Sequence, residues 1–328
     1  MINIINNSHD PYFNMALEEY ILTIMDSSKR YCMLWQNNPA VIVGRNQNTA
    51  GEINEDFIKK LDIKVVRRMS GGGAVYHDLG NLNFTFVVPE TSLTKFDFAK
   101  FTRPVIRALA LLGINAENEG RNDITIKGRK ISGNAQCRRG GRLMHHGTIL
   151  FDTDVNIMEK ALAAKQEKFV SHGVASVRSR VTNIIDHLKI DTSLDEFKKL
   201  LFKTIQAEEN ISDYYLSSEE LNQVNQLARL KYRTWEWNYG ISPWFNVKLK
   251  KRFSWGTVEI RLGINKGLVT SCRIQGDFFS LKELDDLEKY FLSRPYSLEA
   301  MIKALNDIDI SEYIIGAKNQ DIIELFRQ

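Results

Sequence analysis

Short apolar runs separated by polar turns make up most of the first 150 residues of the chain. The clearest run alternates along the sequence, because Leu82, Phe84, Phe86 and Val88 recur at every second position. This two-residue period is typical of a β-strand, whose side chains point to opposite faces in turn. Similar apolar runs predict further strands at 2–5, 31–35, 40–44 and 63–66, the last of which is rich in β-branched residues.

Helical patterns occur between these runs. Asp10-Pro11 has the signature of a helix start, with Asp as the capping residue and Pro at the first helical position. A second helix is predicted over 98–112, ended by Gly113. The pattern predicts more strands at 114–116, 123–127, 130–135 and 146–151, with a tight turn at Gly128-Arg129, and helices at 155–164 and within 194–230.

The pattern changes near Pro243. Two alternating runs, 257–262 and 268–274, flank the hairpin signal Asn265-Lys266-Gly267, and helices are predicted at 281–292, 297–305 and 320–327. We therefore predict two domains, 1–243 and 244–328. The fold class is α/β (α+β), with a mixed, largely antiparallel sheet flanked by helices and a small α+β C-terminal domain.

Composition narrows the class of protein. With 43% hydrophobic residues in 328, the chain can bury a sizeable core without disulfides. Its three cysteines, Cys32, Cys137 and Cys272, lie far apart and predict neither a disulfide framework nor a metal site. The N-terminus lacks the pattern of a signal peptide, and no apolar run approaches the ~20 residues of a membrane span. We expect a cytoplasmic monomer that binds neither membrane nor nucleic acid.

A glycine-rich segment carries the first candidate chemistry. Gly71-Gly72-Gly73 follows Arg67-Arg68 and precedes a short apolar stretch that ends at His77-Asp78. Backbone N–H groups of such a loop can face an anion, and the arginines supply positive charge. An ordinary flexible hairpin loop with exposed arginines gives the same pattern, so the glycines alone do not decide.

A basic segment carries the second. Seven Lys or Arg residues lie between Arg121 and Arg142, with Asp123 as the only acid. Lys130 begins a predicted strand directly after a turn, which gives its side chain a fixed direction. Asp123 either balances this charge or holds Mg²⁺, which prefers carboxylate and phosphate oxygens.

These segments together resemble the lipoate–protein ligase A family, part of the biotin/lipoate ligase superfamily. The resemblance rests on 67–78, on 120–135, on His145-His146-Gly147-Thr148 and on 176–181, in the family's order. It extends from Asp10 to Gly240 and continues more weakly into the tail. It implies a catalytic domain of the class II biotin/lipoate ligase type with an accessory C-terminal domain.

The resemblance implies an ATP-dependent reaction in two steps. Lipoate and ATP give lipoyl-AMP and pyrophosphate, and a lysine of a lipoyl-domain protein then takes the lipoyl group and releases AMP. The implied acceptors are acyltransferase subunits of 2-oxoacid dehydrogenases and the glycine cleavage H protein. ATP and Mg²⁺ are the implied cofactors, and lipoate is the small-molecule substrate.

The resemblance also assigns residues. Lys130 is the catalytic residue, and it contacts both the lipoyl carbonyl and the α-phosphate. Asp123 is the implied metal ligand. The remaining implied binding residues are Arg68, Gly73, Ala74, Val75, Tyr76, Asn83, Arg178 and Arg180, with Asn122 as a weaker polar candidate. Apolar walls for the lipoyl chain are expected from Val41, Ile42, Val43, Ala74 and Val75, whereas His77 and His146 are interpreted as structural.

Other functions fit the sequence less well than an ATP-dependent lipoate–protein ligase. Related transferases on this fold use a cysteine nucleophile without ATP, and Cys137 lies beside arginines. A biotin ligase would also use ATP, and a non-catalytic lipoyl-domain or nucleotide-binding protein could keep the fold. A nucleic-acid binder is disfavoured, because the basic segment lacks the aromatic residues of a stacking platform.

Overall fold

The computed structural model describes residues 1–90, 97–162, 180–239 and 245–327. Its centre is a mixed sheet in which β1 runs parallel to both of its neighbours and every other pair is antiparallel. The strands follow the order β11 (Ser212–Tyr214), β1 (Ile2–Ile4), β2 (Tyr31–Trp35), β6 (Asn81–Pro89), β10 (Arg142–Leu150), β9 (Arg129–Arg139), β8 (Asp123–Ile126) and β7 (Glu117–Glu119).

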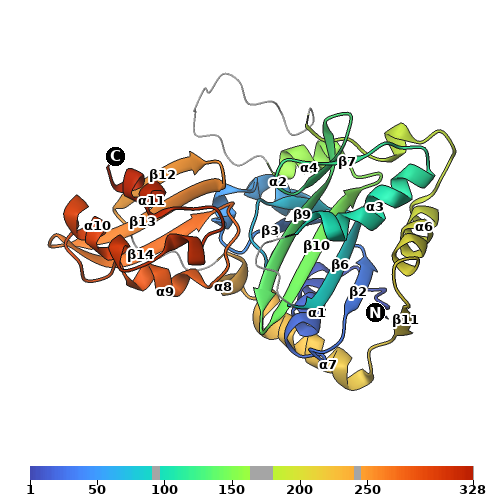
Figure 1. The fold of residues 1–328 in the computed structure, drawn as a ribbon, viewed down its shortest axis with the longest axis horizontal. Helices are drawn as coiled ribbons and strands as arrows, with labels where there is room; N and C mark the ends of the chain where they lie inside the picture. The colour runs from blue at the N-terminus through green and yellow to red at the C-terminus, as the bar shows by residue number, and fades with distance from the viewer. Residues whose placement is uncertain (91–96, 163–179, 240–244, 328) are drawn as a thin grey trace.

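Helices cover both faces of this sheet (Figure 1). One face packs on α3 (Ala99–Leu111) and α6 (Leu194–Gln206), in a core that includes Leu82, Phe84 and Phe86. The other face packs on α1 (Pro11–Thr23), α7 (Ser218–Leu227) and the π-helical turn η3 (Ala228–Tyr232). Strand β6 is therefore buried on both sides. Its alternate side chains point into two different apolar cores, and neither set faces solvent.

A second, three-stranded sheet packs beside the first in the N-terminal part of the chain. Its order is β4 (Lys64–Arg67), β3 (Ala40–Val43) and β5 (Val75–His77). Its outer face packs on α2 (Glu55–Lys60) and α4 (Val155–Ala161). The remaining short elements of this domain are η1 (Thr49–Gly51), η2 (Ile185–His187) and α8 (Trp235–Asn238).

The C-terminal part has its own sheet and its own apolar core. The strands are β12 (Val247–Phe253), β13 (Gly256–Asn265) and β14 (Leu268–Gly276), and the helices are α9 (Leu284–Lys289), α10 (Leu298–Asn306), η4 (Ile310–Glu312) and α11 (Asn319–Phe326). It lies to one side of the N-terminal part and is coloured orange to red in Figure 1. Within the four described ranges, no helix has both the length and the apolar character needed to cross a membrane.

The fold class agrees with the sequence prediction, and local differences have physical reasons. The capped start at Asp10-Pro11 and the end of α3 before Gly113 are present as predicted. No strand covers 114–116, and β7 begins at Glu117 instead. The turn before β9 is Lys127-Gly128, one residue earlier than predicted, because both residues have the positive φ of a type I′ hairpin, 51° and 73°. Strand β12 was missed, since its Lys-rich sequence lacks a clear apolar alternation.

Candidate active site

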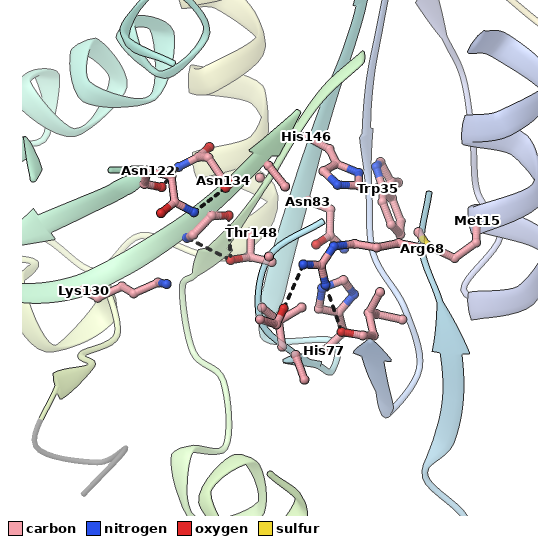
Figure 2. Close-up of a pocket in the computed structure, with 18 residues that line it drawn as sticks. Met15, Trp35, Arg68, His77, Asn83, Asn122, Lys130, Asn134, His146 and Thr148 are labelled. Carbon is pink, nitrogen blue, oxygen red and sulfur yellow. Dashed lines mark hydrogen bonds between the residues drawn. The ribbon is translucent and has the colours of Figure 1, made fainter. Parts of the chain in front are cut away.

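A cavity lies between the main sheet and the small three-stranded sheet. Figure 2 shows its lining residues, which come from both sheets, from α1 and from the loops before β5 and β8. The space not filled by atoms, including the part open to solvent, is about 580 Å³. Its walls comprise Met15, Trp35, Ile42, Arg68, Gly72, Gly73, Ala74, Val75, His77, Asn83, Asn122, Lys130, Gly133, Asn134, Ala135, His146, Gly147 and Thr148.

A second, more polar cavity adjoins the first. The two share Ala74, Val75, Lys130 and Thr148 in their walls. The wall of the second cavity also contains the charged residues Glu119, Arg121, Asp123 and Arg180. Lys130 therefore lies at the junction between a largely apolar cavity and a charged one.

The position of Lys130 follows from the β8–β9 hairpin. Its backbone carbonyl accepts a hydrogen bond from Thr182 N at 3.0 Å, which ties β9 to the segment after residue 179. Its Nζ pairs with Asp123 Oδ1 at 2.8 Å, and both side chains are about one-third exposed. The side chain runs across Gly133, where an added Cβ would lie 2.8 Å from Nζ. Gly133 thus leaves the room that Lys130 occupies.

Asp123 is the carboxylate nearest to Lys130 at this junction. One of its oxygens pairs with Lys130, and the residue lines the second cavity. Within the described ranges, no cluster of three or more His, Cys, Asp or Glu side chains is suited to a metal ion. A single carboxylate fits Mg²⁺ only when phosphate oxygens and water complete the coordination, as is usual for that ion.

Arg68 organises the glycine-rich loop. Its guanidinium donates to Ile42 O at 3.1 Å, Gly71 O at 2.7 Å and Gly73 O at 2.8 Å, and it is nearly inaccessible to solvent. Burial lowers the pKa of Arg68 to about 10, so the group stays charged at neutral pH. Arg68 lines the first cavity, whereas Arg67 points away from both cavities and bonds the carbonyls of Gly44 and Gln47.

The rest of the predicted residues divide between the two cavities. Gly73 and Asn83 line the first, Tyr76 and Arg180 line the second, and Ala74 and Val75 line both. The Nδ2 of Asn83 is buried and has no hydrogen-bond partner among the residues that the structure describes. Asn122 also reaches the first cavity. Arg178 and the motif at 176–179 lie outside the described residues.

The apolar wall differs from the expectation at two positions. Ile42, Ala74 and Val75 line the first cavity, but Val41 and Val43 belong to the core on the opposite face of β3. The reason is the two-residue period of the strand, which sends neighbours to opposite faces. The sequence could have excluded both once Ile42 was assigned.

Met15 and Trp35 also line the cavity, and the sequence analysis missed them because they are distant in sequence from its motifs. Met15 comes from α1 and Trp35 from β2, and the indole of Trp35 donates to Thr85 Oγ1 at 2.9 Å. His146 binds the Glu18 carboxylate through Nδ1 at 2.9 Å and Ser70 Oγ through Nε2 at 2.6 Å. Both ring nitrogens of His146 are therefore occupied, as expected of a structural histidine, although the ring also lines the cavity.

Cys137 lies apart from this site. It lines neither of the two adjoining cavities and is almost entirely buried. Burial raises the pKa of the Cys137 thiol to about 12, so it is not ionised near neutral pH. A thiol in this state is a poor nucleophile.

The C-terminal domain contacts the glycine-rich loop directly. Gly72 N donates to Phe278 O at 3.3 Å, and Gly276 N donates to Asn46 O at 2.8 Å. The guanidinium of Arg121 donates to Trp255 O and stacks over the ring of Phe279. The charged cavity therefore lies next to the domain interface.

Comparison with known proteins agrees with this architecture. The family model for the lipoyl protein ligase A/B catalytic domain matches residues 10–206, and the model for the bacterial lipoate protein ligase C-terminus matches 242–326. The chain is 39% identical to the lipoate-protein ligase LplJ of Bacillus subtilis, covering 97% of each chain. It is 40% identical to lipoate–protein ligase 1 of Staphylococcus aureus, covering 98% of each. The chain belongs to the lipoate–protein ligase family of enzymes.

Solved structures of related proteins align with this chain over most of their own length. LipL1 of P. falciparum, in complex with lipoate, aligns over 99% of this chain and 97% of its own, with a TM-score of 0.79 and 25% identity. A lipoate-protein ligase A bound with ATP aligns over 74% of this chain and 98% of its own, at TM-score 0.63 and 28% identity. A bipartite ligase of Thermoplasma acidophilum, described with its E2 lipoyl domain, covers 75% of this chain and 98% of its own, at TM-score 0.66 and 30% identity.

Proposed function

We propose that the protein joins lipoate to a lysine of lipoyl-domain proteins in two steps, with lipoyl-AMP as the intermediate. The observation that carries the proposal is the position of Lys130 at the junction of an apolar and a charged cavity. An acyl chain in the first cavity would bring its carboxylate to this junction, and a nucleotide in the second would bring its α-phosphate to the same place. The lipoate-bound and ATP-bound relatives support the two ligands.

The first cavity suits the lipoyl chain. Its apolar contacts include Ile42, Val75 and the ring of Trp35. Burying about six methylene equivalents at ~0.8 kcal/mol each would contribute roughly 5 kcal/mol to binding. Such binding fixes the carboxylate at the open end, beside Lys130.

The first chemical step joins two anions, so it needs positive charge at one point. A carboxylate oxygen of lipoate attacks the α-phosphorus of ATP, and the bond to pyrophosphate breaks. The ammonium of Lys130 would stabilise the charge that gathers on the α-phosphate and on the carboxylate. Positioned donors of this kind are each worth roughly 3–4 kcal/mol in a transition state.

Supporting groups surround the phosphates. The backbone of Gly73 to Tyr76, Arg121 and Arg180 lie on the walls of the cavities, and we assign them to the nucleotide. Asp123, with phosphate oxygens, would hold Mg²⁺, which would neutralise part of the phosphate charge. Arg68 would act mainly by fixing the shape of the glycine loop through its carbonyl contacts.

The second step needs no nucleophile from the enzyme. The amine of the acceptor lysine attacks the carbonyl of lipoyl-AMP, AMP leaves with the electrons of the broken bond, and the amine loses a proton. The proposed acceptors are lipoyl domains of 2-oxoacid dehydrogenase acyltransferases and the glycine cleavage H protein. The relative from Thermoplasma acidophilum that is described with an E2 lipoyl domain supports this class.

A transfer through Cys137 is the second candidate, and the burial and raised pKa of its thiol count against it. Pyrophosphate release, measured with lipoate, octanoate and biotin in turn, tests the proposal. We expect ATP-dependent release with lipoate and none with biotin. Modification of an acceptor by an acyl donor without ATP, or release only with biotin, would contradict it.

A further inference from the structure

One buried ring nitrogen in the first cavity has no hydrogen-bond partner among the described residues. The Nε2 of His77 is inaccessible to solvent and makes no hydrogen bond with any described residue, and the residue as a whole is only 3% exposed. His77 lines the cavity, and its ring meets that of Trp35 edge-on at 6.0 Å between centroids. Buried polar groups normally have partners, so the place of this atom in the cavity wall suits it to contact a bound ligand.

A chain of amides determines which nitrogen of His77 carries the proton. Asn14 Nδ2 lies 2.9 Å from Ser8 O and 3.0 Å from Gln36 O. Backbone carbonyls only accept, so the atom of Asn14 that faces them must be its NH₂ group. The orientation of the Asn14 amide is therefore fixed by the backbone.

This orientation is passed to Asn37 and then to His77. Asn14 Nδ2 lies 2.8 Å from Asn37 Oδ1, so the oxygen of Asn37 faces Asn14 and its NH₂ group faces His77. Asn37 Nδ2 lies 3.0 Å from His77 Nδ1 and donates to it. Burial, Arg68 and His146 lower the pKa of His77 to about 3, so the ring is neutral. Nδ1 is then the acceptor, and the hydrogen is on Nε2, toward the cavity.

The depth of His77 in the cavity limits which ligand atom it can meet. Val75 lines both cavities at the Lys130 junction, and His77 lies two residues further along β5 on the same face. Two strand residues span ~6.6 Å. A chain of five C–C bonds of ~1.5 Å, drawn in a zigzag from a carboxyl group at the junction, reaches a similar depth. In lipoate that atom carries the first ring sulfur, whereas octanoate has a methylene there.

We propose that His77 donates its Nε2–H to the ring disulfide of lipoate, and that this contact selects lipoate over unsubstituted fatty acids of the same length. Asn14 and Asn37 act as positioning residues that hold the donor tautomer. The inference rests on the proposed function. An acyl chain without sulfur would leave this buried N–H unpaired, which a desolvated site penalises.

The test compares lipoate with octanoate in matched variants of the full chain, using kcat/KM for pyrophosphate release. Because sulfur is a weak acceptor, we expect His77→Leu to lower the lipoate-to-octanoate ratio by roughly tenfold. His77→Gln, whose amide can present an N–H near the Nε2 position, should restore most of the ratio. Ile42→Val, which changes only the apolar wall, should affect both substrates alike.

Two further measurements keep the test decisive if His77→Leu fails to fold. In ¹⁵N NMR of the wild-type protein, His77 should be the Nε2–H tautomer, and its Nε2–H resonance should shift differently with lipoate and with octanoate. Asn37→Asp keeps the size of the side chain but places a carboxylate oxygen opposite His77 Nδ1, where it accepts a hydrogen bond from Nδ1–H. This variant should change the ¹⁵N signals that report the tautomer and lower the lipoate-to-octanoate ratio.

An unchanged ratio in folded His77→Leu, a parallel loss for both substrates, or an Nδ1–H tautomer in the wild type would each overturn the inference. Wild-type protein that releases pyrophosphate with neither acid would instead overturn the proposed function, and the inference with it.

Discussion

Gly133 offers a way to move Lys130 without removing it. An added Cβ at Gly133 would lie 2.8 Å from Lys130 Nζ and 2.9 Å from Cε. Ordinary contact begins near ~3.5 Å, so the end of the Lys130 side chain must move by roughly 0.7 Å. In Gly133→Ala the lysine keeps its charge but loses its position between the two cavities.

The expected result is an active-site defect in a stable protein. The atom in the way is the flexible end of a side chain that is one-third exposed, so it can give way at little cost. Gly→Ala at a compatible backbone position stabilises by ~0.4–1 kcal/mol, so the melting temperature should not fall. A misplacement of about 1 Å can cost ~100-fold, and we therefore expect pyrophosphate release with saturating lipoate to fall by roughly 10- to 100-fold.

Gly51→Ala is the matched control. An added Cβ there would meet Asn48 Nδ2 at 3.4 Å, an ordinary contact away from both cavities. It should keep the wild-type rate and melting temperature. Wild-type turnover in Gly133→Ala would show that the position of Lys130 does not limit the first step, and a large loss of stability would show that the backbone, rather than the lysine, absorbs the clash.

Three more outcomes are expected. Cys137→Ala should retain ATP-dependent lipoylation, because its thiol is buried and un-ionised; an acyl-enzyme thioester found by mass spectrometry would contradict this. Truncation at about Pro243 removes Phe278, whose carbonyl accepts a hydrogen bond from Gly72 N. The truncated protein should therefore form adenylate poorly but still transfer lipoyl from supplied lipoyl-AMP to an acceptor. A folded truncated protein that forms adenylate at the full rate would contradict this. The pKa of His77 is about 3 in the folded state, below the unfolded value of ~6.5. The free energy of unfolding should therefore decrease as pH falls from 6.5 toward 3. Chemical denaturation should show a smaller decrease for His77→Gln over the same pH range.

Local sequence signals account for most of the fold. The capped start of α1, the left-handed Gly113 after α3 and the turn before β14 each depend on a few adjacent residues, so each was predictable. Strand β12 was not, because charged residues alternate irregularly along it and its partners come later in the chain. The glycine-rich loop and Lys130 were visible as local patterns, but their chemical roles were inferred from the resemblance to the family.

The shape of the site depended on pairings between distant residues. The sequence could not bring Met15, Trp35 and His146 together, since they come from α1, β2 and β10. The same holds for His77, whose tautomer depends on an amide chain that begins 63 residues earlier at Asn14. Arg67 was grouped with Arg68 on sequence, but Arg67 ends β4 and bonds the carbonyls of Gly44 and Gln47, whereas Arg68, just after the strand, lines the cavity.

The central claim is that Lys130 catalyses formation of an acyl adenylate before transfer. The direct measurement is a two-stage reaction: the protein is incubated with lipoate and Mg-ATP, freed of nucleotide by rapid gel filtration, and mixed with a lipoyl domain whose mass is then followed. We predict that wild-type protein carries lipoyl-AMP through the filtration and adds one lipoyl group to the acceptor without further ATP. Folded Lys130→Ala should carry none, yet should show an unchanged melting temperature. Adenylate at wild-type levels in Lys130→Ala, or an acceptor modified with no adenylate at any stage, would contradict the account.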